Sequence, residues 1–286
     1  MFMPRKVLEE KLKQILAEDV GQGDVTTAAI VPEGLKAEAA VIAKEAGVAA
    51  GLEEITILAE SLKLNVKTEV TDGEQIRSGQ IIMKISGNAQ IILSAERTIL
   101  NLLSRMSGIA TTTRRLAEKL RKANATAKIA ATRKTAPGLG YFDKKAVLIG
   151  GGDPHRLRLD DMVLVKDNHI AIARSVESAV KRAKQNASFS KKIEVEVTSV
   201  KDALKAAEAG ADIIMLDNFS PKQIREAVEA LEKAGFFGKI LLEISGGITA
   251  ENLLEYASTQ VDIISMGELT HSVKALDISL EITKTK

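Results

Sequence analysis

The chain of 286 residues contains no cysteine and no tryptophan. Without cysteine it cannot form a disulfide, a thiolate nucleophile or a cysteine-bound zinc site. Aromatic residues make up only 3%, which leaves few rings on which nucleic-acid bases could stack. The 40 basic and 38 acidic side chains nearly cancel, so no global field attracts nucleic acid or an anionic membrane. We therefore expect no nucleic-acid partner, and any preference for anions must be local.

Long apolar runs are also missing, so the sequence predicts no membrane span. The N-terminus lacks the apolar core of a signal peptide and alternates charged and apolar residues with a helical period. Both observations predict a soluble, cytoplasmic protein with no membrane partner. His155, His169 and His271 are far from an i, i+4 spacing, which argues against a metal site built from histidines. A metal, if one binds, should be hard and held by oxygen ligands.

From about residue 127 onward, apolar segments alternate with amphipathic helical patterns. The apolar runs are nearly continuous, which is typical of parallel strands buried on both faces. Such an alternation predicts either a (β/α) barrel or a doubly wound sheet. The six predicted strands cover residues 127–133, 161–168, 192–199, 211–218, 239–247 and 261–269.

The positions of the polar residues separate these two folds. A barrel brings every strand's carboxyl end to one mouth, whereas a doubly wound sheet uses only the ends near its switch point. All six predicted strands end in polar residues or glycine, which favours the barrel. These residues are Arg133 and Lys134; Lys166 and Asn168; Glu196; Asp217 and Asn218; Ser245, Gly246 and Gly247; and Ser265 and Gly267.

The first part of the chain has a different pattern. Residues 64–87 read as strands joined by turns at Asp72-Gly73 and Ser78-Gly79, and a helix follows them. We predict an N-terminal α+β domain over residues 1–108 and a barrel domain over 109–269. The tail, residues 270–286, is expected to pack on the N-terminal domain.

Four permanently cationic side chains and a histidine come from one strand end and from the loop that leads into the next strand. A rim of salt bridges is the ordinary explanation for any one of them. Four permanent cations and a histidine around one mouth exceed what two acids can neutralise, so we expect a ligand with several negative charges. The five are Arg133, Lys134, His155, Arg156 and Lys166.

Two acidic residues follow the neighbouring strands. Glu196 lies between valines in IEVEV and shares its strand face with Glu194, and Asp217 ends IIMLD. A buried carboxylate needs a partner. Glu196 and Asp217 could therefore pair with barrel lysines, hold Mg²⁺ on a phosphorylated substrate, or bind ribose hydroxyls and stabilise positive charge in a transition state.

Small residues end the last two strands, at Ser245-Gly246-Gly247 and at Ser265-Met266-Gly267. Barrels often bind phosphate at this position through backbone N–H groups, although glycine also serves tight turns. The glycines of GGGDPH (150–155) suit either an anion pocket or a mobile loop. His169 suits a helix cap as well as a site residue, and His271 has no assigned role.

Several motifs, in this order, resemble the quinolinate phosphoribosyltransferase family, also called nicotinate-nucleotide pyrophosphorylase (carboxylating). They are TRKTAPG, GGGDPHR, LVKDNH, EVEV, MLDN and SGGI, with ERTILNLLSRMSGIAT and EDVGQGDVTT upstream. The resemblance implies an open, incomplete α/β barrel after an N-terminal α/β sandwich. It also implies a homodimer, or a higher assembly of such dimers. The implied reaction converts quinolinate and phosphoribosyl pyrophosphate to nicotinate mononucleotide, pyrophosphate and CO₂, with Mg²⁺.

The resemblance also implies roles for individual residues. Arg133, His155 and Arg156 would bind the quinolinate carboxylates, together with Arg97 donated by the neighbouring subunit. Lys134, Lys166, Glu196 and Asp217 would be the catalytic residues, and the two acids would lie near the ribose and Mg²⁺. Thr135 and the loops Ser245, Gly246, Gly247 and Ser265, Met266, Gly267 complete the substrate-binding set, the two loops holding the 5′-phosphate.

Four neighbours of these residues depart from the pattern associated with the family. They are Ala131, Gly140, Pro154 and Arg158. They affect the surroundings of Arg133 and His155 and leave every implied ligand in place. Three rival functions stay open from the residues alone: a transferase acting on nicotinate or another anionic ring, a lyase that uses Lys166 as a Schiff-base amine, and an anion-binding module without catalysis.

Overall fold

The computed structural model describes residues 3–286, which form two compact units. The first comprises residues 3–114, Tyr141–Gly151 and Val273–Lys286, and the second comprises Arg115–Gly140 and Gly152–Ser272. These units are not continuous along the chain, because residues 141–151 and the end of the chain belong to the first unit.

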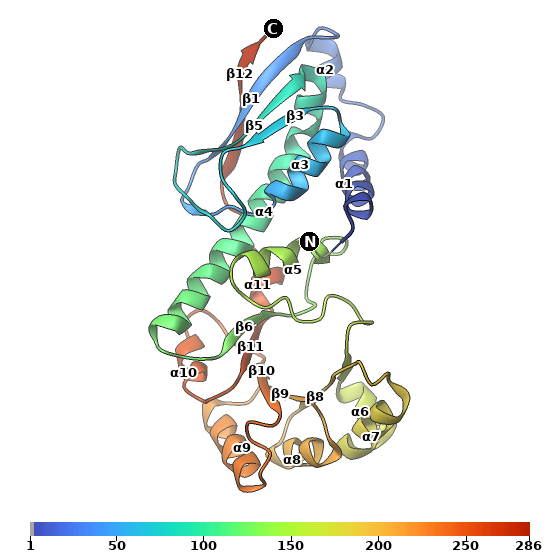
Figure 1. Cartoon of the computed structure of the whole chain (residues 1–286), viewed down its shortest axis with the longest axis vertical. Helices are drawn as coiled ribbons and strands as arrows, with labels where there is room; N and C mark the ends of the chain where they lie inside the picture. The colour runs from blue at the N-terminus through green and yellow to red at the C-terminus, as the bar shows by residue number, and fades with distance from the viewer. Residues whose placement is uncertain (1–2) are drawn as a thin grey trace. The chain divides into compact units, whose positions relative to one another are not determined.

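An antiparallel sheet of four strands organises the first unit, in the order β12-β1-β5-β3 (Figure 1). Most residues of its inner strand β1 are buried, which is typical of a strand with neighbours on both sides. The turns predicted at Asp72-Gly73 and Ser78-Gly79 are present, and both glycines have positive φ. The strands are β1 (Lys36–Ala43), β3 (Asn65–Thr68), β5 (Ile81–Asn88) and β12 (Ile278–Thr285), and β2 (Gly47–Val48) pairs with β4 (Gln75–Ile76).

The C-terminal strand β12 lies antiparallel to β1 and extends that sheet at its edge. The end of the chain, drawn in red in Figure 1, therefore belongs to the same sheet as residues near its beginning. The helices of this unit are α1 (Arg5–Val20), α2 (Val25–Ile30), α3 (Leu52–Ser61) and α5 (Gly140–Ile149). The long helix α4 (Ala89–Lys122) contributes residues to both units.

Six parallel strands form the sheet of the second unit, in the order β6-β11-β10-β9-β8-β7. Each lies inside one of the six segments predicted from the sequence. From β7 to β11 each strand lies next to the strand that follows it in the chain, and β11 pairs with β6. Among the described residues β6 and β7 do not pair, so the barrel is open between its first two strands. The sheet is therefore an open barrel, as predicted. The strands are β6 (Lys128–Ala131), β7 (Val163–Val165), β8 (Ile193–Val197), β9 (Ile213–Asp217), β10 (Leu241–Ser245) and β11 (Ile263–Met266).

Helices follow the strands, and several begin at residues that the sequence makes good caps. The Ser220 side chain accepts a hydrogen bond from Gln223 N–H at the start of α9, and Ser199 does the same for α8. Gly210, with φ of 86°, ends α8. These helices are α6 (Asp167–Ala173), α7 (Val176–Asn186), α8 (Val200–Ala209), α9 (Pro221–Lys233), α10 (Leu253–Ala257) and α11 (Glu268–His271).

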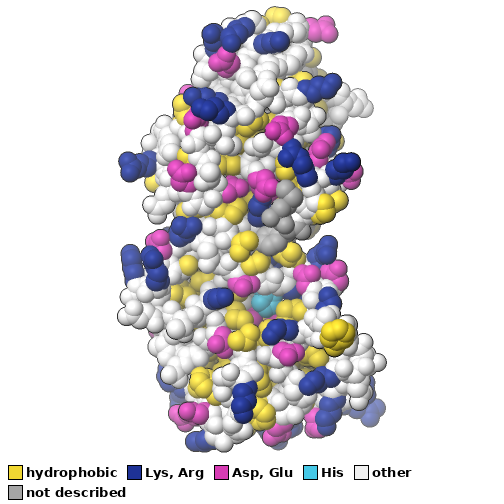
Figure 2. All heavy atoms as spheres, in the orientation of Figure 1, with side chains coloured by type: hydrophobic (Ala, Val, Ile, Leu, Met, Phe, Trp, Pro, Cys, Tyr) yellow, Lys and Arg dark blue, Asp and Glu magenta, His cyan; other side chains and the backbone are white. Residues whose placement is uncertain are grey.

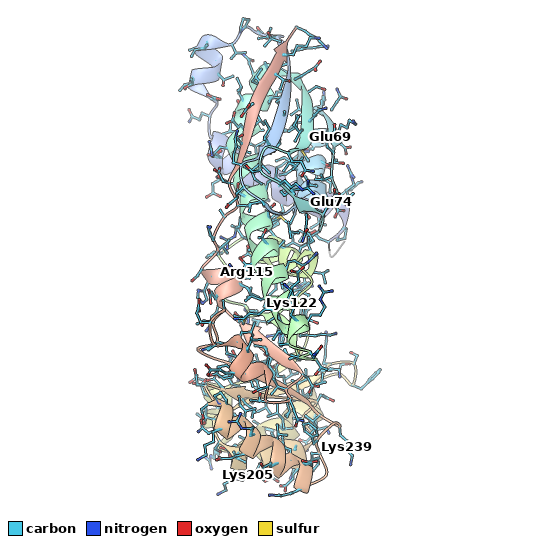
Figure 3. All side chains as sticks on the ribbon, turned by 90° about the vertical axis from the view of Figure 1, so that its left-hand side faces the viewer. Glu69, Glu74, Arg115, Lys122, Lys205 and Lys239 are labelled. Atoms are coloured by element: carbon cyan, nitrogen blue, oxygen red, sulfur yellow. The ribbon has the colours of Figure 1, made fainter. Side chains whose placement is uncertain are left out.

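Charged side chains of both signs are interspersed over the face shown in Figure 2, in keeping with the balanced composition. Figure 3 labels Lys205 of α8 and Lys239, which precedes β10, in the second unit. In the first unit, Glu69 pairs with Lys67 and Lys84. None of the described helices is both long enough and apolar enough to cross a membrane.

Candidate active site

Strand alternation places the predicted site residues on one face of the parallel sheet. In β8, Ile193, Val195 and Val197 alternate with Glu194 and Glu196, so both acids lie on the opposite face from the valines. The register aligns Ser245 with Asp217 and Glu243 with Met215, which continues this face across β9 and β10. The carboxyl ends of the strands therefore bring together residues from distant parts of the sequence.

Lys166 and Glu196 form an ion pair across this edge. Nζ of Lys166 lies 2.5 Å from Oε2 of Glu196. Lys166 follows β7 and Glu196 lies in the adjacent strand β8, so parallel pairing brings the two side chains close. The pairing with a barrel lysine, one of the alternatives for Glu196, is thus present in the structure.

The end of β10 is shaped by a contact between Gly246 and Asn218. Gly246 has a φ of 95°, and a Cβ atom there would lie 2.2 Å from Oδ1 of Asn218. The backbone N–H of Asn218 donates to the Ser245 carbonyl, and its side-chain amide donates to Oδ2 of Asp217 at 2.7 Å. Gly246 is required for this approach, which couples the loop 245–247 to the carboxylate of Asp217.

The end of β11 meets the loop that follows β6. A Cβ atom on Gly267 would lie 3.1 Å from Cδ of Lys134 and 3.0 Å from Cδ2 of His271. The Thr270 hydroxyl donates to the Lys134 carbonyl at 2.8 Å, which ties the two loops together. His271, to which the sequence assigned no role, therefore borders this part of the edge.

Ser265 and Met266 contribute to the loop in different ways. The Ser265 hydroxyl is buried and lacks a hydrogen-bond partner among residues 3–286. Met266 is 1% exposed, so only its backbone can face a ligand. A buried hydroxyl without a protein partner is a group that a ligand oxygen can satisfy.

The three glycines before His155 have structural roles. A Cβ atom on Gly150 would lie 2.6 Å from the Ala110 carbonyl oxygen, so this glycine permits close packing of α5 on α4. Gly151, with φ of 92°, follows at the end of α5. Gly150 and Gly151 therefore end a helix of the first unit, a role that neither a mobile loop nor an anion pocket describes.

Asp153 then enters the open side of the sheet. Its N–H donates to the Ile129 carbonyl, and its own carbonyl accepts from the Ala131 N–H, a parallel bridge to β6. The Asp153 carboxylate accepts from the His155 N–H at 2.7 Å. His155 takes a left-handed backbone conformation with φ of 53°, which is uncommon outside glycine. The bridge therefore fixes where the His155 side chain leaves the backbone.

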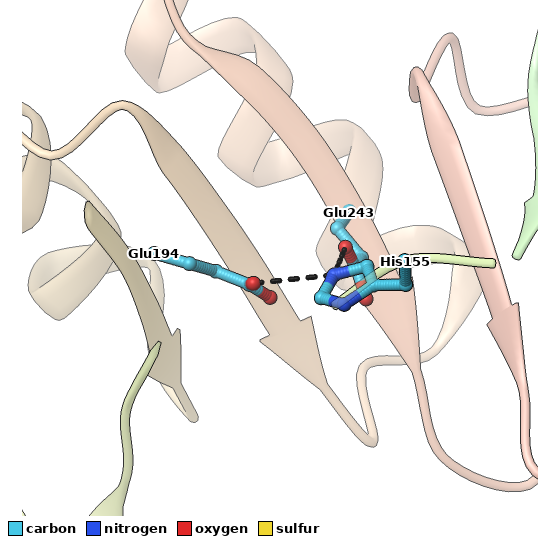
Figure 4. A group of neighbouring side chains, drawn as sticks. All are labelled: His155, Glu194 and Glu243. Atoms are coloured by element: carbon cyan, nitrogen blue, oxygen red, sulfur yellow. Dashed lines mark hydrogen bonds and ion pairs between the residues drawn. The ribbon is translucent and has the colours of Figure 1, made fainter. Parts of the chain in front are cut away.

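The His155 ring points between two buried glutamates of the sheet face. Its Nε2 lies 3.2 Å from Oε2 of Glu194 and 3.1 Å from Oε2 of Glu243, as Figure 4 shows. Burial alone lowers the pKa of His155, but the two carboxylates outweigh it and raise that pKa from 6.5 to about 10. Burial and the nearby Glu243 raise the pKa of Glu194. His155 is therefore an imidazolium near neutral pH.

Glu243 is the residue that the sequence reasoning missed. It lies between Leu242 and Ile244 of β10, the same apolar-strand setting that drew attention to Glu196. It is fully buried and, with His155 and Glu194, forms a group whose ligand atoms lie within 4.8 Å of one another. The rule that buried carboxylates need a partner would have found it.

Arg156 follows His155 and is 8% exposed. Burial, and then the like charge of Arg133, lower its pKa, while Glu194 acts in the opposite direction. Arg133 itself is exposed. Two guanidinium groups near one imidazolium make this edge suited to an anion with more than one carboxylate or phosphate group.

Other predicted residues have less direct roles in this geometry. Thr135 lies in the loop after β6, and a Cβ atom on Gly140 would lie 3.4 Å from its hydroxyl. His169 accepts a hydrogen bond from the Lys166 N–H at 3.0 Å, so it does serve as a helix cap. Arg158 pairs with Asp160 on the surface.

Arg97 belongs to the first unit, whereas the other predicted site residues belong to the second. It is an exposed residue of α4 and lines a hollow of about 350 Å³. The hollow is also lined by Asp24, Thr26, Thr27, Ile30, Val31, Leu93 and Glu96.

Glu196 and Asp217 offer two carboxylates on neighbouring strands, with Lys166 and Asn218 as their respective partners. Two oxygen donors fit Mg²⁺, which is commonly held by one or two carboxylates and by substrate phosphates. They are too few for an ion bound by protein atoms alone. The donor set therefore fits a metal ion that arrives with a phosphorylated substrate.

An open parallel α/β barrel with cations and glycine loops at its strand ends defines a class of enzyme that binds phosphorylated, multiply anionic substrates. Residues 109–281 match the C-terminal domain of quinolinate phosphoribosyl transferase, and residues 24–107 match its N-terminal domain. The chain belongs to the quinolinate phosphoribosyl transferase family. The family membership expected from the sequence motifs is confirmed.

Relatives of this chain carry the corresponding names. A protein of Methanocaldococcus jannaschii named probable nicotinate-nucleotide pyrophosphorylase (carboxylating) is 50% identical over 277 residues, which cover 96% of each chain. The human nicotinate-nucleotide pyrophosphorylase (carboxylating) is 39% identical over 99% of this chain and 94% of its own. The solved structure of nicotinate-nucleotide pyrophosphorylase from Francisella tularensis, 36% identical, has a TM-score of 0.89 and covers 98% of both chains.

Proposed function

We propose that this protein transfers the phosphoribosyl group from phosphoribosyl pyrophosphate to quinolinate and releases pyrophosphate and CO₂, forming nicotinate mononucleotide for NAD biosynthesis. The observation that carries the proposal is the grouping of Arg133, His155 and Arg156 at one edge of the barrel in a member of this family. Three cations suit a ring with two adjacent carboxylates better than a ring with one.

Different residues along this edge act on different parts of the two substrates. The quinolinate nitrogen attacks C1′ of the ribose as the bond from C1′ to pyrophosphate breaks, and the departing pyrophosphate takes the bonding electrons. Lys134 and Lys166 stabilise that negative charge, and Glu196 and Asp217 stabilise the positive charge that develops at the ribose. The loops 245–247 and 265–267 bind the 5′-phosphate through backbone N–H groups and the Ser265 hydroxyl.

Decarboxylation follows from the charge on the ring. Once the nitrogen is bonded to C1′, its positive charge stabilises the electron pair that stays on ring carbon 2 when the 2-carboxylate departs as CO₂. The ring carbon then takes a proton, which gives nicotinate mononucleotide. No side chain forms a covalent bond to substrate, so the protein acts by positioning the reactants and stabilising charge.

Mg²⁺ forms part of the proposal and, when bound, neutralises pyrophosphate charge as that group leaves. The carboxylates of Glu196 and Asp217, along with oxygens of the substrate, would bind the Mg²⁺ ion. We also propose a homodimer, or a higher assembly of dimers, in which Arg97 completes the partner's site. We also propose that the protein is located in the cytoplasm.

The direct test is incubation of the protein with quinolinate, phosphoribosyl pyrophosphate and Mg²⁺, with product separation by chromatography. Nicotinate mononucleotide and an equal amount of CO₂ are expected. A parallel reaction with nicotinate in place of quinolinate is expected to give far less product, because one carboxylate leaves part of the cationic group without a partner. The same nucleotide formed from nicotinate at an equal rate would favour the rival transferase.

The Schiff-base lyase is the second candidate, and Lys166 tests it. Lys166 is paired with Glu196 at 2.5 Å, whereas a Schiff base requires an uncharged amine. Borohydride added during turnover is expected to leave Lys166 unmodified, as read by mass spectrometry. A reduced substrate adduct on Lys166 would contradict the non-covalent reaction.

A further inference from the structure

Glu194 and Glu243 have no assigned part in the proposed reaction, but both lie against His155, which does. Their side chains are 0% and 1% exposed, and they come from β8 and β10 on either side of β9. We call His155, Glu194 and Glu243 the histidine clamp. Figure 4 shows both carboxylates directed at one ring nitrogen of His155.

A buried carboxylate is costly without a partner, and this pair has two carboxylates within reach of one another. Atoms Oε1 and Oε2 of Glu194 and Oε1 of Glu243 have no hydrogen-bond partner within residues 3–286. The His155 ring lies between the two acids, with its Nε2 3.2 Å from Oε2 of Glu194 and 3.1 Å from Oε2 of Glu243. One imidazolium offsets the charge of the two acids only in part.

The clamp also determines the direction in which the His155 ring points. The backbone of His155 is held on one side by the Asp153 carboxylate and by the bridge of Asp153 to β6. Its Nε2 is held from the other side by two strands that are themselves fixed in the sheet. A ring restrained at both ends also restrains the backbone from which the adjacent Arg156 projects.

We propose that Glu194 and Glu243 are positioning residues for quinolinate, which hold His155 as a fixed cation and thereby place Arg156 at the barrel edge before substrate binds. The proposal rests on the proposed function, since quinolinate is the ligand of these cations. The glutamates themselves need not touch substrate. Their contribution is to the binding of the ring carboxylates and not to the binding of phosphoribosyl pyrophosphate.

The first test reads His155 in the whole protein without substrate. In protein labelled with ¹⁵N-histidine, the His155 signal is identified by its loss in His155→Gln. We expect an imidazolium with a proton on Nε2 at pH 8, because Glu243 is hydrogen-bonded to that nitrogen and Glu194 forms an ion pair with it. The proton affinity of His155 should fall at least about tenfold in Glu194→Gln and in Glu243→Gln, since each loses one carboxylate.

The second test is a steady-state assay of the same variants. We expect the KM for quinolinate to rise about tenfold in each, with the KM for phosphoribosyl pyrophosphate changed less than about twofold. Glu226→Gln on the exposed surface of α9 removes one negative charge from the same unit and should match the wild type. In a His155→Gln background, Glu243→Gln should raise the KM for quinolinate little further, because the ring through which it acts is gone.

A neutral His155 in the wild type at pH 8, or a nitrogen signal typical of metal coordination, would overturn the proposal. So would equal increases in both KM values. If the variants fail to fold, which circular dichroism would show, the wild-type signal still decides. A wild type that binds no quinolinate and makes no nicotinate mononucleotide would refute the proposed function and leave the measured state of the clamp intact.

Discussion

At the scale of single residues, Gly246 has a backbone conformation and a neighbour that other residues do not tolerate. A side chain there would be strained by the φ of 95° and would displace Asn218, which donates to Asp217. From the sequence, this glycine could be assigned either to a phosphate loop or to a turn. The positive φ supports the turn, and the contact with Asn218 shows that the same turn orients a carboxylate of the site.

Gly246→Ala is therefore expected to lower stability by about 1–2 kcal/mol, the cost of a left-handed conformation. It should also raise the KM for phosphoribosyl pyrophosphate by roughly tenfold, because Asn218 is pushed away from Asp217. Urea unfolding and initial-rate assays measure the two effects.

Gly235→Ala is the matched control. Gly235 has a φ of 76° and no atom within 4 Å of an added Cβ. It should show a similar loss of stability with unchanged KM values. An equal change in KM for both variants would mean that backbone strain, and not the contact with Asn218, is responsible.

At the scale of elements, α5 is held in the first unit by charge as well as by apolar packing. Lys145 on α5 lies 2.6 Å from Oε1 of Glu54 on α3, and it also pairs with Glu53. Burial raises the pKa of Glu54, whereas the nearby Lys145 acts to lower it. The sequence pattern predicts helices here, but it cannot show that two residues 91 positions apart meet.

Lys145→Met should destabilise the protein by roughly 3 kcal/mol, because it leaves the carboxylate of Glu54 buried without its cation. Adding Glu54→Gln is expected to recover most of that loss, since both charges are then removed. Urea unfolding of the single and double variants gives the coupling between them.

The exposed pair Lys181 and Glu177 on α7 serves as the comparison. Lys181→Met should change stability little, because solvent screens an exposed pair. If the double variant at Lys145 and Glu54 were no more stable than Lys145→Met, the buried ion pair would not explain how α5 is held.

At the scale of the whole molecule, the chain is organised by segments that leave one unit and join the other. Residues 141–151 and the C-terminal strand β12 belong to the first unit although the barrel sequence lies between them. The predicted barrel strands are present and the tail belongs to the first unit, but the sequence does not show that residues 141–151 join that unit as well. Hydrophobic periodicity reports local structure and carries no information on which unit a segment joins.

The proposed dimer makes a prediction at this scale. Arg97→Ala and Arg133→Ala should each be nearly inactive alone. Mixed in equal amounts under exchange, they should recover up to about a quarter of wild-type activity, because half of the dimers in a two-fold assembly are mixed and each has one intact site.

Activity assays before and after exchange, with size-exclusion chromatography to show that dimers form, provide the measurement. Mixed dimers that form without regaining activity would show that Arg97 does not complete the neighbour's site. A preparation of Arg133→Ala mixed with itself is the control for exchange alone.

The sequence by itself determined the six parallel strands, their barrel order and the family, because burial period, strand-end polarity and contiguous motifs are all local signals. It also predicted that Glu196 could pair with a barrel lysine, and Lys166 is that partner, since the carboxyl ends of parallel strands share one edge. Only the tertiary structure decided that the GGG segment ends a helix, that Asp153 bridges to β6, and that His155 lies between Glu194 and Glu243. These arrangements depend on the space left between particular strands, and a pattern along one strand does not specify that space.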